Sequence, residues 1–158
     1  MNNMQGKFPS TRLRRNRMKE FSRRLVAENT LSVNDLILPL FVCEGNKVDD
    51  PINSMPGVSR YSIDKLLSEV EKAVKFNIPA IAIFPQIESG LKNSEGSLAV
   101  DENNLVCRSI KSIKKDFPNI GIVCDVALDP FTDHGHDGLV INDKIDNDKT
   151  LEVLEQQA

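Results

Sequence analysis

The residue types best suited to chemistry gather in one segment, residues 125–138. Both histidines of the chain and four of its aspartates fall within thirteen consecutive residues of this segment. They are Asp125, Asp129, Asp133, His134, His136 and Asp137. Carboxylates and imidazoles can transfer protons, bind a metal ion or stabilise a positive charge. The same composition also fits an ordinary solvated acidic loop.

Asp125 differs from the other aspartates in its sequence surroundings. It lies within an apolar run, residues 120–126, which predicts a buried strand. Burial of a carboxylate is costly unless it has a partner. We therefore expect Asp125 to be buried beside a positive group, either a metal ion or a protonated amine.

Three apolar runs predict the strands that position this segment. They cover residues 36–42, 80–84 and 120–126 and are apolar on both faces, as is typical of strands in a parallel sheet. Pro39 cannot donate a backbone hydrogen bond, so it predicts a bulge or a missing bond in the first strand. The stretch 44–61, which contains Pro51, Pro56 and Gly57, predicts a long loop.

Apolar residues at helical spacing predict helices between these strands. The first helix is expected to begin after Ser62 as its N-cap and to end before Pro79. The second is expected over residues 103–116. A third helix is expected to be capped by Asn147 or Asp148 and to have barely started where the sequence stops.

This order of elements predicts an α/β fold with parallel strands. Short helix-to-strand and long strand-to-helix connections are typical of a TIM (β/α)8 barrel, whose chemistry lies at the carboxyl ends of its strands. We therefore predict a partial barrel of about three β/α units over residues 34–158, cut in its third helix. A doubly wound open sheet is the alternative, although no glycine-rich phosphate-binding motif follows any strand.

Residues 1–33 are predicted to form a separate basic arm. Residues 1–25 carry eight Lys or Arg and one acid, whereas the whole chain has a net charge of −3. We expect the arm to dock on an acidic surface of another copy and so to mediate oligomerisation. A solvated tail is one alternative, and a nucleic-acid arm is disfavoured because aromatic residues do not alternate with the basic ones.

The composition also predicts the cellular location of the protein and the redox state of its three cysteines. No run of about 18 apolar residues is present to span a bilayer, and no secretory signal follows the basic start, so we expect a cytoplasmic protein without a membrane partner. Cys43, Cys107 and Cys124 are far apart and odd in number, which favours reduced and mostly buried thiols.

The segment D-V-A-L-D-P-F-T-D-H-G-H-D-G resembles the active-site loop of the porphobilinogen synthases, which are also called 5-aminolevulinate dehydratases. Other segments match this family in the same order. They are the basic R-x-R-R motif, D-L-I-L-P-L-F-V, S-M-P-G-V-S-R-Y, the strand ending I-F-P, and G-S-L-A-V-D. Together these matches extend from about residue 10 to the end of the sequence.

The resemblance implies a lyase of haem and tetrapyrrole biosynthesis. Family members condense two molecules of 5-aminolevulinate to porphobilinogen with loss of two waters, on a (β/α)8 barrel whose arm embraces a neighbouring subunit, usually in a homo-octamer. Two strand-borne lysines hold the substrates as Schiff bases. Every lysine of this chain that follows the arm is expected on a helix or in a loop, with Lys144 among the loop residues.

Two interpretations of the chain follow from the missing lysines. It is expected to be the amino-terminal half of such an enzyme and inactive by itself, because the family's catalytic lysines correspond to positions beyond Ala158. Alternatively, it is a non-catalytic short form that assembles with full-length subunits. An unrelated metal-dependent barrel hydrolase using Asp125, Asp129, His134 and His136 is a third interpretation.

The resemblance also suggests roles for individual residues. It places Asp125 near the substrate amine or the Schiff-base region, as a supporting catalytic residue. It places Phe84 in the wall of the substrate pocket, unless Phe84 is plain core. Asp129 and Asp137, with His136 beside them, are the candidate metal ligands. The zinc-binding members have cysteines where this chain has Ala127, Asp129 and Asp137. Magnesium or a monovalent cation is therefore expected, and zinc is not.

Overall fold

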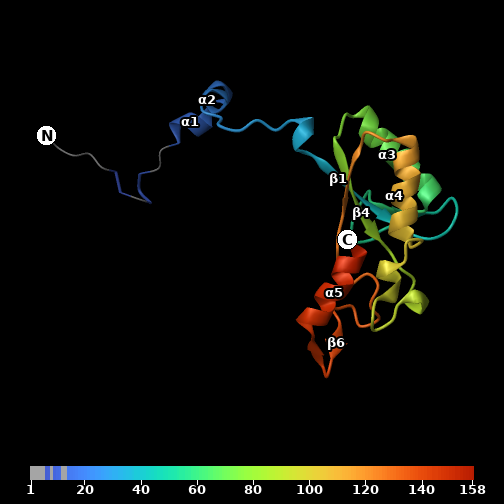
Figure 1. The fold of residues 1–158 in the computed structure, drawn as a ribbon. Helices are drawn as coiled ribbons and strands as arrows, with labels where there is room; N and C mark the ends of the chain where they lie inside the picture. The colour runs from blue at the N-terminus through green and yellow to red at the C-terminus, as the bar shows by residue number, and fades with distance from the viewer. Residues whose placement is uncertain (1–5, 8, 12–13) are drawn as a thin grey trace. The chain divides into compact units, whose positions relative to one another are not determined.

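The computed structural model describes residues 6–7, 9–11 and 14–158, and the chain divides into two compact units, residues 1–32 and 33–158 (Figure 1). Part of the predicted basic arm, including Arg12 of its R-x-R-R motif, lies outside the described residues. Across the described part of the chain, no helix has both the length and the apolar character needed to cross a membrane.

The first unit contains two short helices, α1 (Arg15–Met18) and α2 (Glu20–Leu25). Neither helix has a buried residue. The apolar side chains of Met18, Phe21 and Leu25 are all more than half exposed. These helices therefore have no hydrophobic core of their own.

The second unit is a mixed α/β structure built on a five-stranded sheet. The strands are β1 (Ile37–Val42), β2 (Asp49–Pro51), β3 (Ser59–Tyr61), β4 (Ala80–Pro85) and β5 (Gly121–Cys124), in the spatial order β2-β3-β1-β4-β5. Strands β3, β1, β4 and β5 are parallel, and β2 pairs with β3 in the antiparallel direction. The three predicted strands are thus confirmed, although β5 is shorter than the predicted run of residues 120–126.

Pro39 does not introduce a bulge, so that part of the prediction is wrong. The parallel register of β1 and β4 runs without interruption from the pair Ile37 and Ala80 to the pair Val42 and Pro85. Cys43 N–H points to β3, so by alternation the nitrogen of Pro39 faces the same side. Because β3 pairs only with Phe41 and Val42, the missing N–H of Pro39 lies beyond the end of β3.

The segment predicted as a long loop after β1 contains two strands. Strands β2 and β3 form an antiparallel pair in which Asp50 lies opposite Arg60, and their side chains form an ion pair of 3.1 Å. Each strand has three residues, which is too short for a recognisable alternating pattern.

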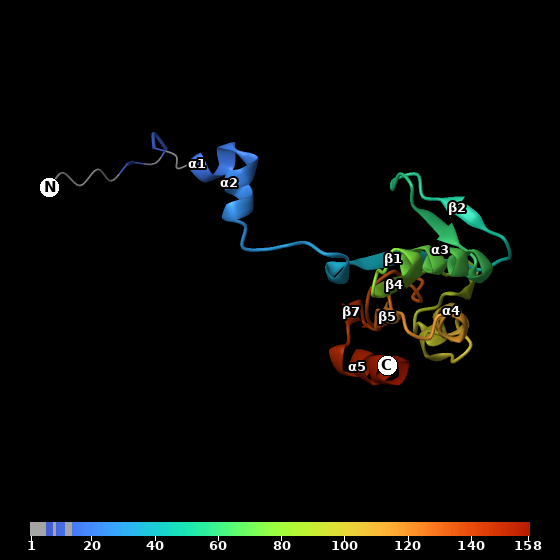
Figure 2. The same cartoon turned by 90° about the horizontal axis from the view of Figure 1, so that it is seen from above.

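Helices α3 (Ile63–Lys75) and α4 (Leu105–Asp116) cover one face of the sheet (Figures 1 and 2). Both predictions are confirmed, and Ser62 is the residue before α3 as expected. Its hydroxyl, however, makes no capping bond, because it donates to Asp64 Oδ1 at 2.6 Å and accepts from Val48 N–H at 2.9 Å. The core between sheet and helices contains Leu40, Val42, Ile81, Ile83, Leu66, Val70, Ala73, Leu105 and Ile113.

The third helix, α5 (Asn147–Gln157), is longer than expected. It follows a hairpin of two short strands, β6 (Val140–Ile141) and β7 (Lys144–Ile145). Its cap is Asp146, whose carboxylate accepts from Lys149 N–H at 3.1 Å, and not Asn147 or Asp148. Single turns of 3₁₀ helix lie at Val33–Asp35, Ser89–Leu91 and Ser97–Val100.

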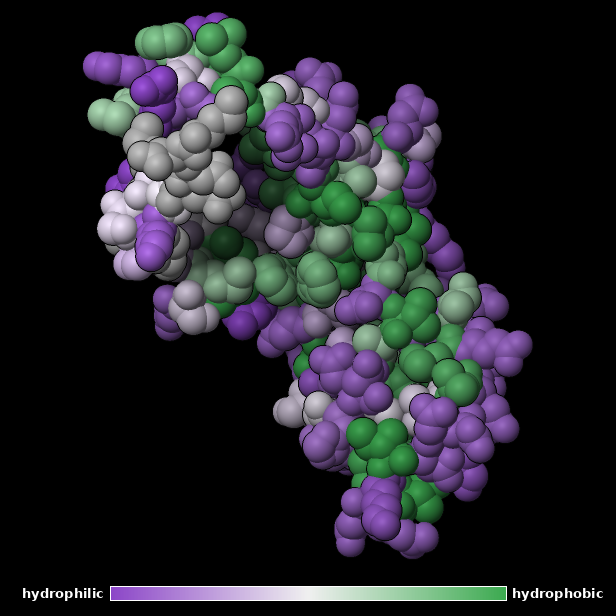
Figure 3. Space-filling view, turned by 90° about the vertical axis from the view of Figure 1, so that its left-hand side faces the viewer, coloured by the Kyte–Doolittle hydropathy of each residue, from purple (hydrophilic) through white to green (hydrophobic). Residues whose placement is uncertain are grey.

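The other face of the sheet is open and apolar. Side chains alternate between faces along a strand, so Ile37, Phe41, Phe84 and Val123 lie opposite the helices. Ile37 is 55% exposed and Val123 is 46% exposed, and the rings of Phe41 and Phe84 lie 5.7 Å apart. Figure 3 views the chain from the side away from α3 and α4 and shows hydrophobic residues gathered there. The sheet therefore has one packed face and one face without a covering layer of described residues.

We expect substitutions on the two faces to differ in their effect on stability. Ile81 is fully buried, so Ile81→Ala should lower the free energy of unfolding by about 2–5 kcal/mol. The neighbouring strand offers Val123→Ala as a control on the open face, which should cost less than about 1 kcal/mol. Urea titrations of both variants and the parent chain measure these values. Equal losses would contradict the assignment of the packed face.

Candidate functional site

A cavity of about 460 Å³ lies at the carboxyl ends of β4 and β5. Phe84 and Pro85 line it from the end of β4, and Asp125 and Asp129 line it from the segment after β5. The start of α4 forms a further wall, with Val106, Cys107 and Ile110. In parallel α/β structures this end of the sheet holds the reactive groups. The cavity therefore brings together Phe84, Asp125 and Asp129, and it is also lined by Ala127, Cys107 and Cys124.

A second cavity, of about 370 Å³, lies at the opposite end of the strands. It is lined by the helix-to-strand turns that include Ile78, Pro79, Phe117 and Pro118, and its only carboxylate among the lining residues is Asp116. In a barrel fold this end contributes to stability and not to catalysis. The first cavity is therefore the candidate site.

Asp125 is exposed, so the expectation that it is buried is wrong. Strand β5 ends at Cys124, and Asp125 comes directly after it on the same side of the chain as the exposed Val123. This side is the open face of the sheet. Its carboxylate thus meets solvent and the cavity, and burial alone does not require a positive partner.

Phe84 is half-buried and lies on the open face, beside Phe41 in the register of β1 and β4. It is not among the residues of the packed core, and it lines the cavity. This position fits a wall of the cavity better than plain core.

Asp129 and Asp137 are close enough to influence each other electrostatically. Partial burial raises the pKa of the Asp129 carboxyl, and the negative charges of Asp137 and then Asp125 raise this pKa further. Asp137 accepts a hydrogen bond of 2.7 Å from Leu128 N–H. Asp137 therefore holds the backbone of the segment that carries Asp129, a role that the sequence pattern did not indicate.

His134 and His136 lie farther along the loop and do not line the cavity. His136 N–H donates to His134 Nδ1 at 3.1 Å, and the His134 ring lies 3.3 Å from the carbonyl oxygen of Ser94 through Nε2. Among the residues that the structure describes, no three His, Cys, Asp or Glu side chains converge on a point that could hold a metal ion. The histidines are used in local loop contacts.

Backbone hydrogen bonds join two loops that are distant in sequence, the loop after β4 and the loop after β5. Asn93 pairs with Thr132 in an isolated parallel bridge, with Asn93 N–H donating to Phe131 O at 3.4 Å and Asp133 N–H donating to Asn93 O at 3.2 Å. Phe131 and Thr132 are almost fully buried. This joint holds the acidic loop, and sequence periodicity offered no signal for it because it involves single residues.

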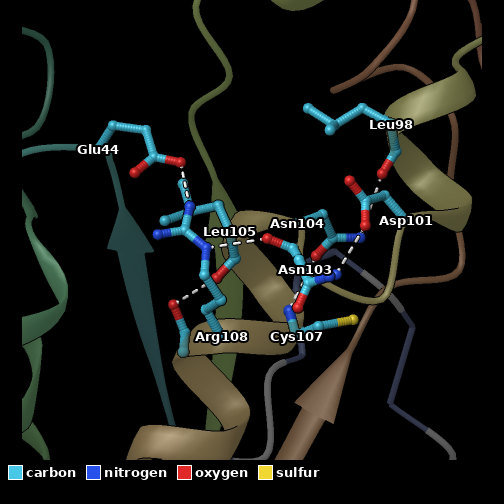
Figure 4. A network of polar contacts seen from close by, with 9 residues as sticks. Glu44, Leu98, Asp101, Asn103, Asn104, Leu105, Cys107 and Arg108 are labelled. Carbon is cyan, nitrogen blue, oxygen red and sulfur yellow. Dashed lines mark hydrogen bonds and ion pairs between the residues drawn. The ribbon is translucent and has the colours of Figure 1, made fainter.

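A polar network fixes the start of α4 (Figure 4). Arg108 forms an ion pair with Glu44, which follows β1, and donates from Nε to Asn103 O at 2.9 Å. Asn104 caps the helix by accepting from Cys107 N–H at 2.8 Å, and its amide also donates to the carbonyl oxygens of Leu98 and Ala99. The network therefore joins α4 to the carboxyl end of β1 and to the loop before the helix.

The described lysines lie away from the cavity. None is on β1, β4 or β5, and none lines the candidate site. Lys144 is on the short strand β7 and not in a loop as predicted, but it is exposed. The cavity as this chain forms it therefore has carboxylates and no amine.

Comparisons with known proteins agree with the sequence pattern. A model of the family described as Delta-aminolevulinic acid dehydratase matches residues 10–158. The enzyme of that name from Bradyrhizobium diazoefficiens is 54% identical over 147 residues, which are 93% of this chain and 42% of the relative. The one from Chlamydia pneumoniae is 43% identical over 145 residues, which are 92% of this chain and 44% of the relative.

A solved structure of the same family also matches this chain. The chain resembles delta-aminolevulinic acid dehydratase (porphobilinogen synthase) from Toxoplasma gondii, solved in complex with the reaction product porphobilinogen, with a TM-score of 0.85 and 40% sequence identity. The match covers 93% of this chain and 42% of the solved chain. This chain thus spans less than half the length of the relatives that it matches.

The electrostatics of Asp129 lead to a pH-dependent prediction. A carboxyl whose pKa is higher in the folded than in the unfolded chain makes the folded state lose stability as pH rises through that interval. Asp129→Asn should therefore be more stable than the parent at pH 7, by less than about 1 kcal/mol because solvent screens an exposed carboxylate. The difference should vanish below about pH 4. Urea unfolding between pH 3 and pH 7 measures it.

Asp64 offers a matched control with the opposite sign. The hydrogen bond from the Ser62 hydroxyl, and then that from Lys47 N–H, lowers the pKa of the Asp64 carboxyl. Asp64→Asn should therefore be less stable than the parent at pH 7 and equal to it at a pH below both pKa values. If both variants shifted in the same direction, the electrostatic interpretation of Asp129 would be wrong.

Proposed function

The chain belongs to the delta-aminolevulinic acid dehydratase family, and on this premise we propose that it forms the acidic side of that enzyme's substrate site. The proposed reaction is the condensation of two molecules of 5-aminolevulinate to porphobilinogen, with loss of two waters. The observation that carries the proposal is the cavity at the ends of β4 and β5, lined by Phe84, Asp125 and Asp129.

The proposed fold of the whole enzyme is a TIM (β/α)8 barrel, of which this chain supplies about three β/α units. Strands β1, β4 and β5 lie side by side in the sheet and are parallel, with α3 directly before β4 and α4 directly before β5 in the helix and strand order. Helices on one face only are typical of a barrel wall, in which the other face points to the barrel interior. The open apolar face with Phe41, Phe84 and Val123 supports this assignment.

Asp125 is proposed to stabilise the positive charge of the substrate ammonium, or that of the iminium which forms, with loss of water, from the substrate carbonyl and a lysine amine. A carboxylate at a fixed position lowers the energy of such a charge most when water is excluded from the site. Phe84 is proposed to exclude water as one wall of that site. The Schiff-base lysines of the reaction are proposed to come from the part of the relatives' length that this chain does not span.

A cation at the site is proposed to be magnesium or a monovalent ion and not zinc. Carboxylates stand at positions 129 and 137, and carboxylate oxygen suits these hard ions. Because the described residues provide no group of three ligands, a metal held by this chain alone does not fit. Charge stabilisation by Asp125 requires no metal.

Residues 1–33 are proposed to dock on a neighbouring subunit of a cytoplasmic homo-oligomer, an octamer by family resemblance. The exposed Phe21 and Leu25, beside the basic residues of α2, support a surface that becomes covered on assembly.

The first test of this function uses borohydride, which reduces a Schiff base to a stable adduct. With 5-aminolevulinate, this chain should give no stoichiometric adduct, because no described lysine lies on the central strands or at the cavity. Intact-mass measurement detects the adduct. The Bradyrhizobium diazoefficiens relative is the positive control, and a defined adduct on a lysine of this chain would contradict the proposal.

The second test asks for activity by complementation. When this chain is mixed with the part of the Bradyrhizobium diazoefficiens relative that it does not match, we expect porphobilinogen to form, and Asp125→Asn to lower the rate by about 100-fold or more. Asp133→Asn on the same loop is the control and should keep the parent rate, because Asp133 is exposed and does not line the cavity. Equal rates for both variants would remove Asp125 from the site.

A further inference from the structure

We propose that Gln157 and Asp137 are positioning residues, which together clamp the peptide group between Ala127 and Leu128 and thereby fix how Asp125 and Asp129 face the cavity. The inference rests on the proposed function only in taking Asp125 and Asp129 as the acidic side of the site. The clamp itself is a property of the described side chains.

The two hydrogen bonds of the clamp meet at one peptide group. Gln157 Nε2 donates to the carbonyl oxygen of Ala127 at 3.1 Å. Leu128 N–H, on the other side of the same peptide group, donates to Asp137 Oδ1 at 2.7 Å. A peptide group is planar and rigid, so rotation about its long axis would break both bonds at once. Its orientation is therefore fixed from both sides.

The clamped peptide lies between the two carboxylates that line the cavity. Asp125 is two residues before Ala127, and Asp129 directly follows Leu128. The side chains of Ala127 and Leu128 are buried, with exposed fractions of 7% and 0%. Burial holds these residues in place but does not choose the orientation of their peptide, whereas the two hydrogen bonds do.

The clamp joins elements that are far apart in the sequence. Gln157 is the last residue of α5, and Asp137 belongs to the loop before β6. Gln157 also lines the cavity, together with Asp125 and Asp129. The end of α5 therefore reaches back across about thirty residues to the segment that follows β5.

The oxygen of the Gln157 side-chain amide makes no hydrogen bond to a described residue, so the amide N–H is the group that fixes the peptide. Gln157 Oε1 is buried and has no hydrogen-bond partner among the described residues. An unpaired buried acceptor is unfavourable. Replacing Gln157 by leucine removes the donor and the unpaired acceptor together, so a positioning role predicts a local change without a general loss of stability.

The experiment uses the whole chain and the variant Gln157→Leu, with Gln156→Leu as a matched control on the exposed neighbouring residue. Amide hydrogen exchange by NMR should show Leu128 N–H exchanging about tenfold faster in Gln157→Leu, with Ile83 and Ile113 unchanged. Gln156→Leu should match the parent at all three amides.

Two variants of Asp137 keep the proposal testable if Gln157→Leu does not fold. Asp137→Asn keeps an oxygen that can accept from Leu128 N–H, so slow exchange of this amide should persist. Asp137→Ala removes the acceptor, so exchange of Leu128 should also accelerate.

The proposal is overturned if Leu128 exchange in Gln157→Leu equals that of the parent. It is also overturned if exchange accelerates uniformly at Leu128, Ile83 and Ile113, because that is general destabilisation. None of these measurements uses 5-aminolevulinate. A failure of the condensation test alone would therefore reject the proposed function and leave the clamp supported.

Discussion

The continuous pairing of β1 with β4, and the burial of their helix-facing side chains, is the constraint on which the site depends. Leu40 and Ile83 lie side by side in the register and are both buried beneath α3 and α4. A shift of one residue would move these side chains to the open face and bring Phe41 and Phe84 under the helices. The register therefore determines both the core and the wall of the cavity.

The same register determines where Phe84 and Asp125 lie. Strand β5 continues the parallel pairing through Ile81 and Ile122, so β4 and β5 end at the same edge of the sheet. Phe84 and Asp125 then lie at that edge because they occur where the strands stop. The arrangement is a consequence of strand ends and face alternation, and it needs no long-range contact between the two side chains.

The repeating part of this fold could be predicted from the sequence, because long apolar runs and helical spacing directly reflect burial. The single residues and short segments could not. Asp125 was expected to be buried because its neighbours are apolar, but an apolar strand in this sheet has only one packed face. Asp146 was missed as a cap because Asn147 and Asp148 are equally suitable residue types, and only the backbone geometry distinguishes them. The clamp at Ala127 involves backbone groups, whose partners leave no pattern in the sequence.

The bridge between Asn93 and Thr132 has a consequence for motion. Hydrogen bonds in both directions connect the loop after β4 to the loop after β5, and Phe131 and Thr132 on the second loop are buried. Neither loop can open alone without breaking these bonds, so the two form one cooperative unit in local unfolding. Opening of the rim of the cavity should therefore expose both loops together, in one event.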